Sequence, residues 1–216
     1  KSDSFSIYPD TNNNFYTFDE LIKSIEKSQT DKDGKTIILY ASNIDEQDSY
    51  IKAAESKGYK VLLLDSPIVP HLIQKLESKK ENISFARVDS DSIDNLIKKE
   101  DNIISKLDDK EKDMLKTYIE AVIPKEKYTI QLEALDSKEL PFIITQPEFM
   151  RRMKDMQQSG GNNMFGSMPE IHNVIINVNN DLVYTIFNSK SKAKRERLIK
   201  QSLDIARLSQ NLLKCE

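Results

Sequence analysis

The stretch GKTIILYASNIDEQDSYIKAAESKGYKVLLLDSP (residues 34–67) decides the fold of the first half of this chain. It contains two short apolar runs, TIILY (36–40) and KVLLL (60–64), each with the length and composition of a buried β-strand. Between them, residues 44–57 have the apolar spacing of a helix, which Gly58 closes. A strand, a helix and a second strand in this order predict a right-handed parallel crossover.

The same alternation extends on both sides of this stretch. Thr17 and Glu20 have the spacing of a capping box, which predicts a helix that starts after residue 17. Further along, residues 66–78 predict a helix that Ser66 caps, residues 84–88 (SFARV) a third strand and residues 91–99 a short helix. Together these elements predict an α/β fold, a small αβα sandwich with a parallel sheet.

The pattern changes after a predicted helix over residues 108–122. We therefore place a boundary near residue 125 and predict two domains, 1–125 and 126–216. In the second domain strands and helices no longer alternate regularly, which indicates an α+β fold. Its predicted strands are 128–135, 140–144 and 173–178, and its last two helices are 181–187 and 194–214.

Residues 145–168 hold five of the six methionines of the chain. Thr145 and Glu148 have capping-box spacing and precede a short helix with one apolar stripe, which Gly160 and Gly161 end. Thioether side chains are flexible and polarizable, so the stripe suits an adaptable contact surface, although an ordinary core helix has the same spacing. The apolar candidates are Phe149, Met150, Met153, Met156, Met164, Phe165 and Met168.

The last predicted helix carries an apolar stripe that is broad enough to require partners. Two interpretations stay open, namely packing onto its own domain and a subunit interface. The residues of the stripe are Leu198, Ile199, Leu203, Ile205, Ala206, Leu208, Leu212 and Leu213.

The residue types give little support for an enzyme or a metal protein. No His, Cys and carboxylate cluster has the spacing of metal ligands, and no phosphate-binding loop follows a strand. Asp65 and Asp89 end two of the predicted parallel strands, where an enzyme could keep a carboxylate, but turn and N-cap roles are far more common there. We expect no catalytic residue.

Charge and hydropathy give no support for nucleic-acid or membrane partners. The net charge is −3, and the basic run over residues 190–200 lacks interleaved aromatics, so it is interpreted as a solvated helix start. No apolar run approaches the ~20 residues that span a bilayer. The single Cys215 cannot form an internal disulfide, which suits a reducing compartment.

These stretches together resemble the heat-shock protein 90 chaperone family, in particular its bacterial branch. The run DKDGKTIILYASNIDEQDSYIKAAESKGYKVLLLDSPIVPHLIQKLE (31–77) is similar to the later part of the family's middle domain. Three further stretches are similar to its C-terminal domain, namely PEFMRRMKDM (147–156), MPEIHNVIINVN (168–179) and RERLIKQSLDIARLSQNLLK (195–214).

The resemblance implies a fragment of a cytoplasmic, ATP-dependent stress-response chaperone that binds partly unfolded client proteins. Residues 1–125 would be the end of the middle domain, and residues 126–216 the dimerization domain. By residue matching, client contact falls on Phe149, Met150, Met153 and Met156, and also on Met164, Phe165 and Met168.

Two departures from the family limit what we expect of this chain. Nothing matches the N-terminal domain that binds ATP and Mg, so we expect neither ATP hydrolysis nor a cofactor here. Family members continue past the position of Lys214 with a helix that completes a four-helix dimer bundle. A homodimer is therefore implied for the full-length protein, and dimerization of this chain stays open. The alternative hypothesis is a flavodoxin-like α/β enzyme with a helical appendage.

Overall fold

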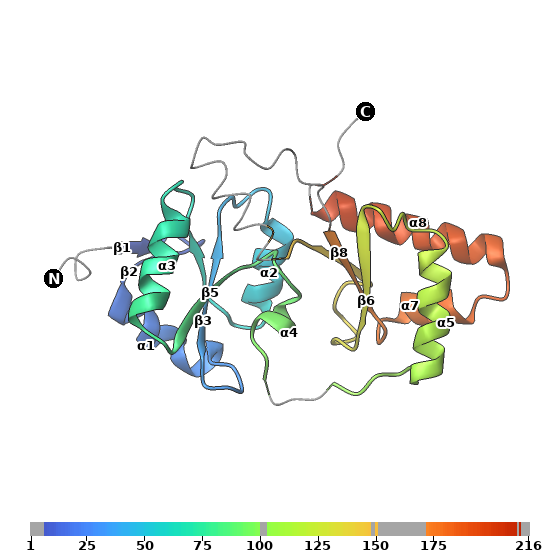
Figure 1. Cartoon of the computed structure of the whole chain (residues 1–216), viewed down its shortest axis with the longest axis horizontal. Helices are drawn as coiled ribbons and strands as arrows, with labels where there is room; N and C mark the ends of the chain where they lie inside the picture. The colour runs from blue at the N-terminus through green and yellow to red at the C-terminus, as the bar shows by residue number, and fades with distance from the viewer. Residues whose placement is uncertain (1–6, 100–102, 148–149, 151–171, 211, 213–216) are drawn as a thin grey trace. The chain divides into compact units, whose positions relative to one another are not determined.

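The computed structural model describes residues 7–99, 103–147, 150, 172–210 and 212 (Figure 1). The described residues divide into two compact units. The first unit consists of the described residues within Lys1–Glu100 together with Pro147 and Met150, and the second consists of those within Asp101–Gln146 and Ser167–Glu216. Each unit has its own sheet and its own apolar core.

The sheet of the first unit contains three parallel strands. They are β3 (Thr36–Ala41), β4 (Val61–Leu63) and β5 (Ile83–Arg87), and their order is β4-β3-β5. Leu39 of β3 lies opposite Val61 of β4 and opposite Ala86 of β5. Each strand overlaps the run that predicts it, with ends that differ by one residue, and both pairings are parallel, as the sequence predicts.

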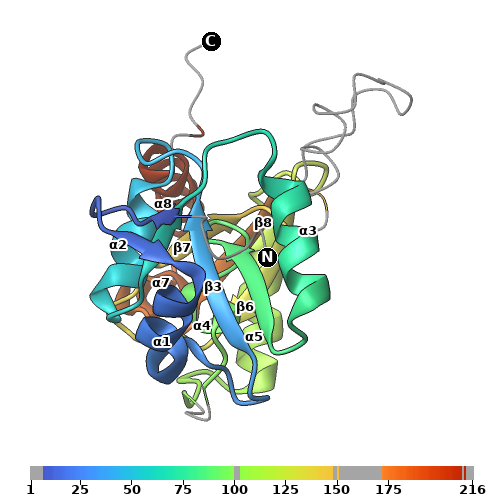
Figure 2. The same cartoon turned by 90° about the vertical axis from the view of Figure 1, so that its left-hand side faces the viewer.

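Helices cover both faces of this sheet. Alternation along β3 turns Ile38 and Tyr40 toward one face, and Ile37 and Leu39 toward the other. On the first face lie α1 (Phe18–Gln29) and α3 (Val69–Lys79); on the second lie α2 (Asp48–Ser56) and α4 (Ile93–Leu96). Figure 2 shows α2 and α3 on opposite sides of β3. A short antiparallel hairpin precedes α1 and consists of β1 (Ile7–Pro9) and β2 (Phe15–Thr17).

Two helices show where the local sequence is enough to predict the first residue of a helix and where it is not. The predicted capping box of α1 is present, with reciprocal hydrogen bonds between Thr17 and Glu20. By contrast, α3 begins at Val69, three residues after the predicted cap Ser66. A helix capped by Ser66 would need an N–H at residue 70 for its first hydrogen bond, and residue 70 is proline.

The sheet of the second unit is mixed. Strand β8 (His172–Asn177) lies in the middle, parallel to β6 (Tyr128–Glu133) and antiparallel to β7 (Phe142–Thr145). Three helices accompany this sheet, namely α5 (Asp109–Glu120), α7 (Asp181–Asn188) and α8 (Lys192–Ser209).

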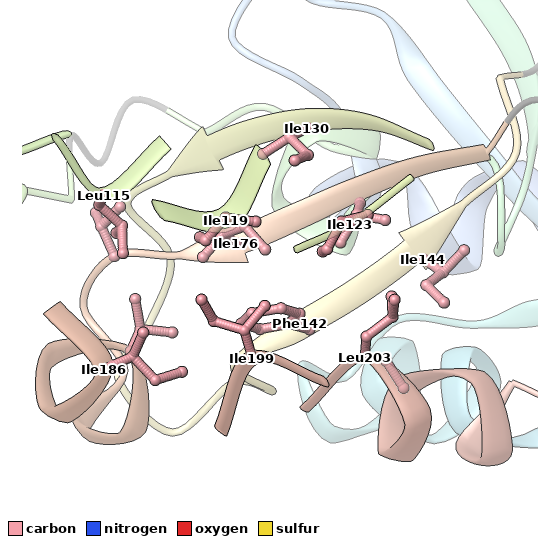
Figure 3. Close-up of a cluster of buried hydrophobic side chains, with 14 of the residues drawn as sticks. Leu115, Ile119, Ile123, Ile130, Phe142, Ile144, Ile176, Ile186, Ile199 and Leu203 are labelled. Carbon is pink, nitrogen blue, oxygen red and sulfur yellow. The ribbon is translucent and has the colours of Figure 1, made fainter. Parts of the chain in front are cut away.

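The core of the second unit joins all three helices to one face of this sheet (Figure 3). Leu115 and Ile119 of α5 are fully buried in it, together with Phe142 of β7 and Ile176 of β8. This packing differs from the predicted boundary near residue 125, which places α5 in the first domain. The division lies between residues 100 and 101 instead, because the apolar side of α5 is buried against the second sheet.

A buried asparagine fixes the start of the second unit. The side-chain amide of Asn179 donates to the carbonyls of Ile104 (3.0 Å) and Leu135 (3.1 Å), and its oxygen accepts from the backbone N–H of Lys106 (2.8 Å). Neighbouring Asn177 is also buried and accepts from Leu135 (3.2 Å). The segment that enters α5 is therefore held by hydrogen bonds to the turn between β8 and α7.

Candidate protein-binding site

One side of α8 belongs to the core of its own unit. Ile199, Leu203 and Ala206 are 0%, 8% and 2% exposed, and they pack in the cluster that holds Phe142 and Ile144 of β7 (Figure 3). The sequence places these three residues in a possible dimer interface. In the structure they fill their own core, which leaves them no surface for a subunit contact. Leu198 and Leu212 are half-buried against the same core, and Leu213 lies outside the described residues.

The opposite side of α8 is exposed and includes two residues of the predicted interface. Ile205 is 61% exposed and Leu208 is 67% exposed. Helical spacing continues this side through Gln201 to Arg197 and Lys194, all of them exposed. We name these five residues the outer face of α8. Its C-terminal half is apolar and its N-terminal half is basic.

The basic half begins at an unusual helix start. Ser191 caps α8 with its side chain, but the first turn of α8 contains no acidic residue. Acidic residues are present in the first turns of α1, α5 and α7. Arg195 stacks on the ring of Tyr118 at 3.6 Å and donates to the carbonyl of Ser189 at 3.1 Å. The sequence interpretation assigns no role to this arginine, because its aromatic partner lies on another helix.

The Met-rich segment is the other predicted contact surface. Met150 is in a helical conformation and half-buried. The remaining client-contact candidates lie outside the described residues, namely Phe149, Met153, Met156, Met164, Phe165 and Met168. The sixth methionine, Met114, lies on α5 and is 50% exposed.

The carboxyl edge of the parallel sheet holds an ion pair. Asp89 accepts from Nε and Nη2 of Arg87 at 2.5 and 2.7 Å, a bidentate contact between two largely buried side chains. Its carboxylate is thus already bound by a cation of the same chain. Asp65, at the end of the neighbouring strand, is exposed. This geometry does not favour the flavodoxin-like enzyme hypothesis.

The described residues contain no group of three or more His, Cys, Asp or Glu side chains that could hold a metal ion. His71 is exposed on α3, and His172 lies in β8 beside Tyr128. Among the helices that the structure describes, none is long and apolar enough to cross a membrane.

The sequence of this chain was compared with those of known proteins, and the relatives found carry the same name. No protein-family model matches the chain. The chain is 40% identical over 197 residues to Chaperone protein HtpG of Bacteroides thetaiotaomicron, covering 89% of this chain and 29% of that protein. It is 38% identical over 208 residues to Chaperone protein HtpG of Porphyromonas gingivalis, covering 94% and 30% respectively. For Chaperone protein htpG of Bacteroides fragilis, the identity is 40% over 196 residues, covering 89% and 29%.

The chain thus spans about three tenths of the length of these relatives. The alignments cover nearly all of this chain at a level of identity that indicates common descent. The resemblance found in the sequence alone points to the same family. The chain belongs to the HtpG chaperones, the bacterial members of the heat-shock protein 90 family.

Proposed function

We propose that this chain is the part of an HtpG chaperone that contacts partly unfolded client proteins and joins two protomers. The observation that supports a chaperone role most directly is the identity of about 40% to proteins named as HtpG chaperones. The chain carries out no chemistry of its own in this proposal. It supplies contact surfaces, and ATP binding belongs to parts of the full-length protein that this chain does not match.

Client contact is assigned to the Met-rich segment over residues 145–168. Five methionines and two phenylalanines there offer apolar surface that can adapt to clients of different shape. The family resemblance and the side-chain chemistry support the same residues independently.

The test of client contact is suppression of aggregation of a thermally unfolded client by the chain. The double variant Met153→Asp/Met156→Asp should abolish most of the suppression, because a carboxylate is poorly accommodated in an apolar contact. Met114→Asp is the matched control, since Met114 is half exposed on α5 and outside the segment. If the double variant suppressed aggregation as well as the unchanged chain, the assignment of this surface would be wrong.

Dimerization is assigned to the outer face of α8, where Ile205 and Leu208 are exposed. Two exposed aliphatic side chains one helical turn apart are a small apolar surface, so we expect weak self-association. Sedimentation equilibrium over micromolar concentrations tests this. Ile205→Asp/Leu208→Asp should give a monomer at every concentration. If this variant associated as strongly as the unchanged chain, the outer face would not be the dimer contact.

We also propose that the chain neither binds nor hydrolyses ATP. The described residues offer no phosphate-binding loop and no metal cluster. Fluorescence titration with an ATP analogue and with a flavin separates the chaperone proposal from the flavodoxin-like alternative. Micromolar binding of either ligand would favour the enzyme.

A further inference from the structure

Both outer edges of the sheet in the first unit are bonded within the unit itself. At the edge formed by β4, the carbonyl of Val61 accepts from the N–H of Thr11 at 3.0 Å. At the edge formed by β5, the N–H of Phe85 donates to the carboxylate of Glu77 on α3 at 2.8 Å. An unbonded strand edge can pair with another chain, and natural proteins usually close such edges. Each edge of this sheet therefore has a contact that opposes such pairing.

The outer edges of the sheet in the second unit are formed by β7 and β6. At β7, the N–H of Ile144 donates to the side-chain oxygen of Gln210 at 2.9 Å. Gln210 is the C-cap of α8 and is buried, so this edge is also closed by its own unit. The edge of β6 is different.

The hydrogen bonds between β6 and β8 determine which groups of β6 point away from the sheet. Alternate residues of a strand bond to the neighbouring parallel strand. The carbonyls of Lys127 and Glu133 accept from N–H groups of β8 at 3.1 and 2.9 Å, which fixes the phase of this alternation. Ile130 and Leu132 are out of phase with these two residues, so their N–H and C=O groups point away from β8. Among the described residues, none is hydrogen-bonded to the backbone of Ile130 or Leu132.

The side chains of β6 alternate between the two faces of the sheet. Ile130 is buried in the core (Figure 3), and Tyr128 and Leu132 are half-buried against the same core. Thr129 and Gln131 are exposed on the other face. A strand added beside β6 would therefore have an apolar neighbour row on one face and a polar neighbour row on the other. A segment in which apolar and polar residues alternate fits both rows.

The chemistry of this edge favours an unfolded chain as its partner. The main-chain groups of a folded protein are mostly bonded already, whereas those of an extended, partly unfolded segment are not. Hydrogen bonds to the main chain do not depend on which side chains a segment carries, so this contact accepts many sequences. Such tolerance suits clients that have the unfolded state in common rather than a sequence.

We propose that the outer edge of β6 binds an extended segment of a partly unfolded client by strand addition. The N–H and C=O groups of Ile130 and Leu132 would bond to the segment, and its apolar side chains would lie beside Tyr128 and Leu132. This main-chain contact adds to the side-chain contact assigned to the Met-rich segment. The inference deepens the proposed contact with clients and rests on it for the kind of partner.

The first measurement is amide hydrogen exchange of the whole chain, followed by NMR. In the free chain, the amides of Ile130 and Leu132 should exchange fast, whereas the amide of Gln131, which bonds to β8, should be protected. If all three amides were equally protected, the edge would already be closed and the inference would be wrong. Protection of Ile130 and Leu132 that rises with the concentration of the chain alone would identify β6 of a second copy as the occupant, which also overturns it.

The probe is a short synthetic peptide of alternating threonine and valine between two lysines, titrated into the chain. We expect weak, saturable binding that slows exchange at Ile130 and Leu132 and leaves Gln131 unchanged. Two further probes carry N-methyl groups, one on the valine amides and one on the threonine amides. Only one of these sets can face β6, because the main-chain groups of a strand alternate between its two edges. One methylated probe should therefore bind like the unmodified peptide and the other should not bind. Equal binding of both, or of neither, contradicts strand addition.

A pair of variants at one position tests the same hydrogen bonds from the side of the protein. Leu132→Pro removes an N–H that points away from β8, a position where an edge strand tolerates proline. Leu132→Ala is the matched control, because it also removes the leucine side chain but keeps the N–H. The proline variant should bind the probe about fivefold more weakly than the alanine variant. Equal affinity of the two variants would overturn the inference. Protection of Val174 in β8 checks that both variants are folded, and the methylated probes decide the question if Leu132→Pro is not.

The Met-rich segment provides the last comparison. Met153→Asp/Met156→Asp should bind the probe as the unchanged chain does, because the edge of β6 does not include these residues. A variant of the Met-rich segment that failed to bind the probe would place the peptide there instead and overturn the inference. Aggregation assays report the Met-rich contact separately. An unchanged suppression in that variant would refute only the proposed side-chain contact.

Discussion

Replacing Ile199 by alanine, with Ile205→Ala as its control, separates the core side of α8 from its outer face. Both residues are isoleucines of the same helix, but Ile199 is 0% exposed and Ile205 is 61% exposed. The replacement removes three carbon atoms, and at about 0.8 kcal/mol per buried methylene the transfer from water accounts for about 2.4 kcal/mol. The cavity left among Phe142 and its neighbours should raise the total loss to about 3–4 kcal/mol.

For Ile205 less than half of the side chain is buried, so the same arithmetic gives about 1 kcal/mol or less. Hydrogen exchange of the β8 amides, measured by mass spectrometry, isolates the free energy of opening of the second unit from that of the first. The protection of Val174 and Ile176 should fall strongly in Ile199→Ala and little in Ile205→Ala. Equal losses would refute the assignment of the two sides of α8.

Three further predictions follow from particular contacts. Asn179→Asp should cost the second unit about 3 kcal/mol, because a carboxylate cannot donate to the carbonyls of Ile104 and Leu135, and exchange of the β8 amides measures it. In the first unit, burial opposes the charged form of Asp10, but hydrogen bonds from Asn14, Asn12 and Tyr16 outweigh it and lower the pKa of this carboxyl. The stability that Asp10 contributes is therefore present above the unfolded-state pKa of about 4 and is lost as the pH falls through the folded-state pKa. The urea midpoint of the Asp10→Asn variant should therefore change less with acidic pH than the midpoint of the unchanged chain. Finally, Lys194→Glu should raise the stability of the second unit by about 0.3–1 kcal/mol, since it places an acid in the first turn of α8, and thermal melting of the variant checks this.

Much of the fold is predictable because it rests on local sequence. The apolar run TIILY has few alternatives to a buried strand, and β3 is found there. Capping boxes depend only on residues three apart, and those of α1 and α5 are present. Where the prediction fails, contacts with residues outside the predicted element override its local sequence preference. Residues 44–47 precede α2 as a turn, because the side chain of Gln47 accepts hydrogen bonds from Ser42 and Asn43 at the end of β3.

The domain boundary and the contact surfaces are less predictable from sequence. A helix such as α5 has one apolar side whichever sheet it packs on, so its pattern does not assign it to a unit. Asn179 has the appearance of a turn or cap residue, and its hydrogen bonds to Ile104 and Lys106 depend on segments more than seventy residues away. For the Met-rich segment, composition and family resemblance remain the basis of the prediction.

The structure buries one side of the α8 stripe in its own core, and the subunit-interface interpretation stays a proposal for the other side. A stripe that includes both Ile199 and Ile205 is wider than a single packed face, since these residues lie far apart around the helix. Ile199, Leu203 and Ala206 are buried in the core, whereas Ile205 and Leu208 are exposed on the outer face. Hydrophobic pattern alone cannot make this division, because both sides consist of aliphatic residues. The charges contribute to it, because Lys194 and Arg197 continue the outer side as exposed cations, whereas the side of Ile199, Leu203 and Ala206 is buried.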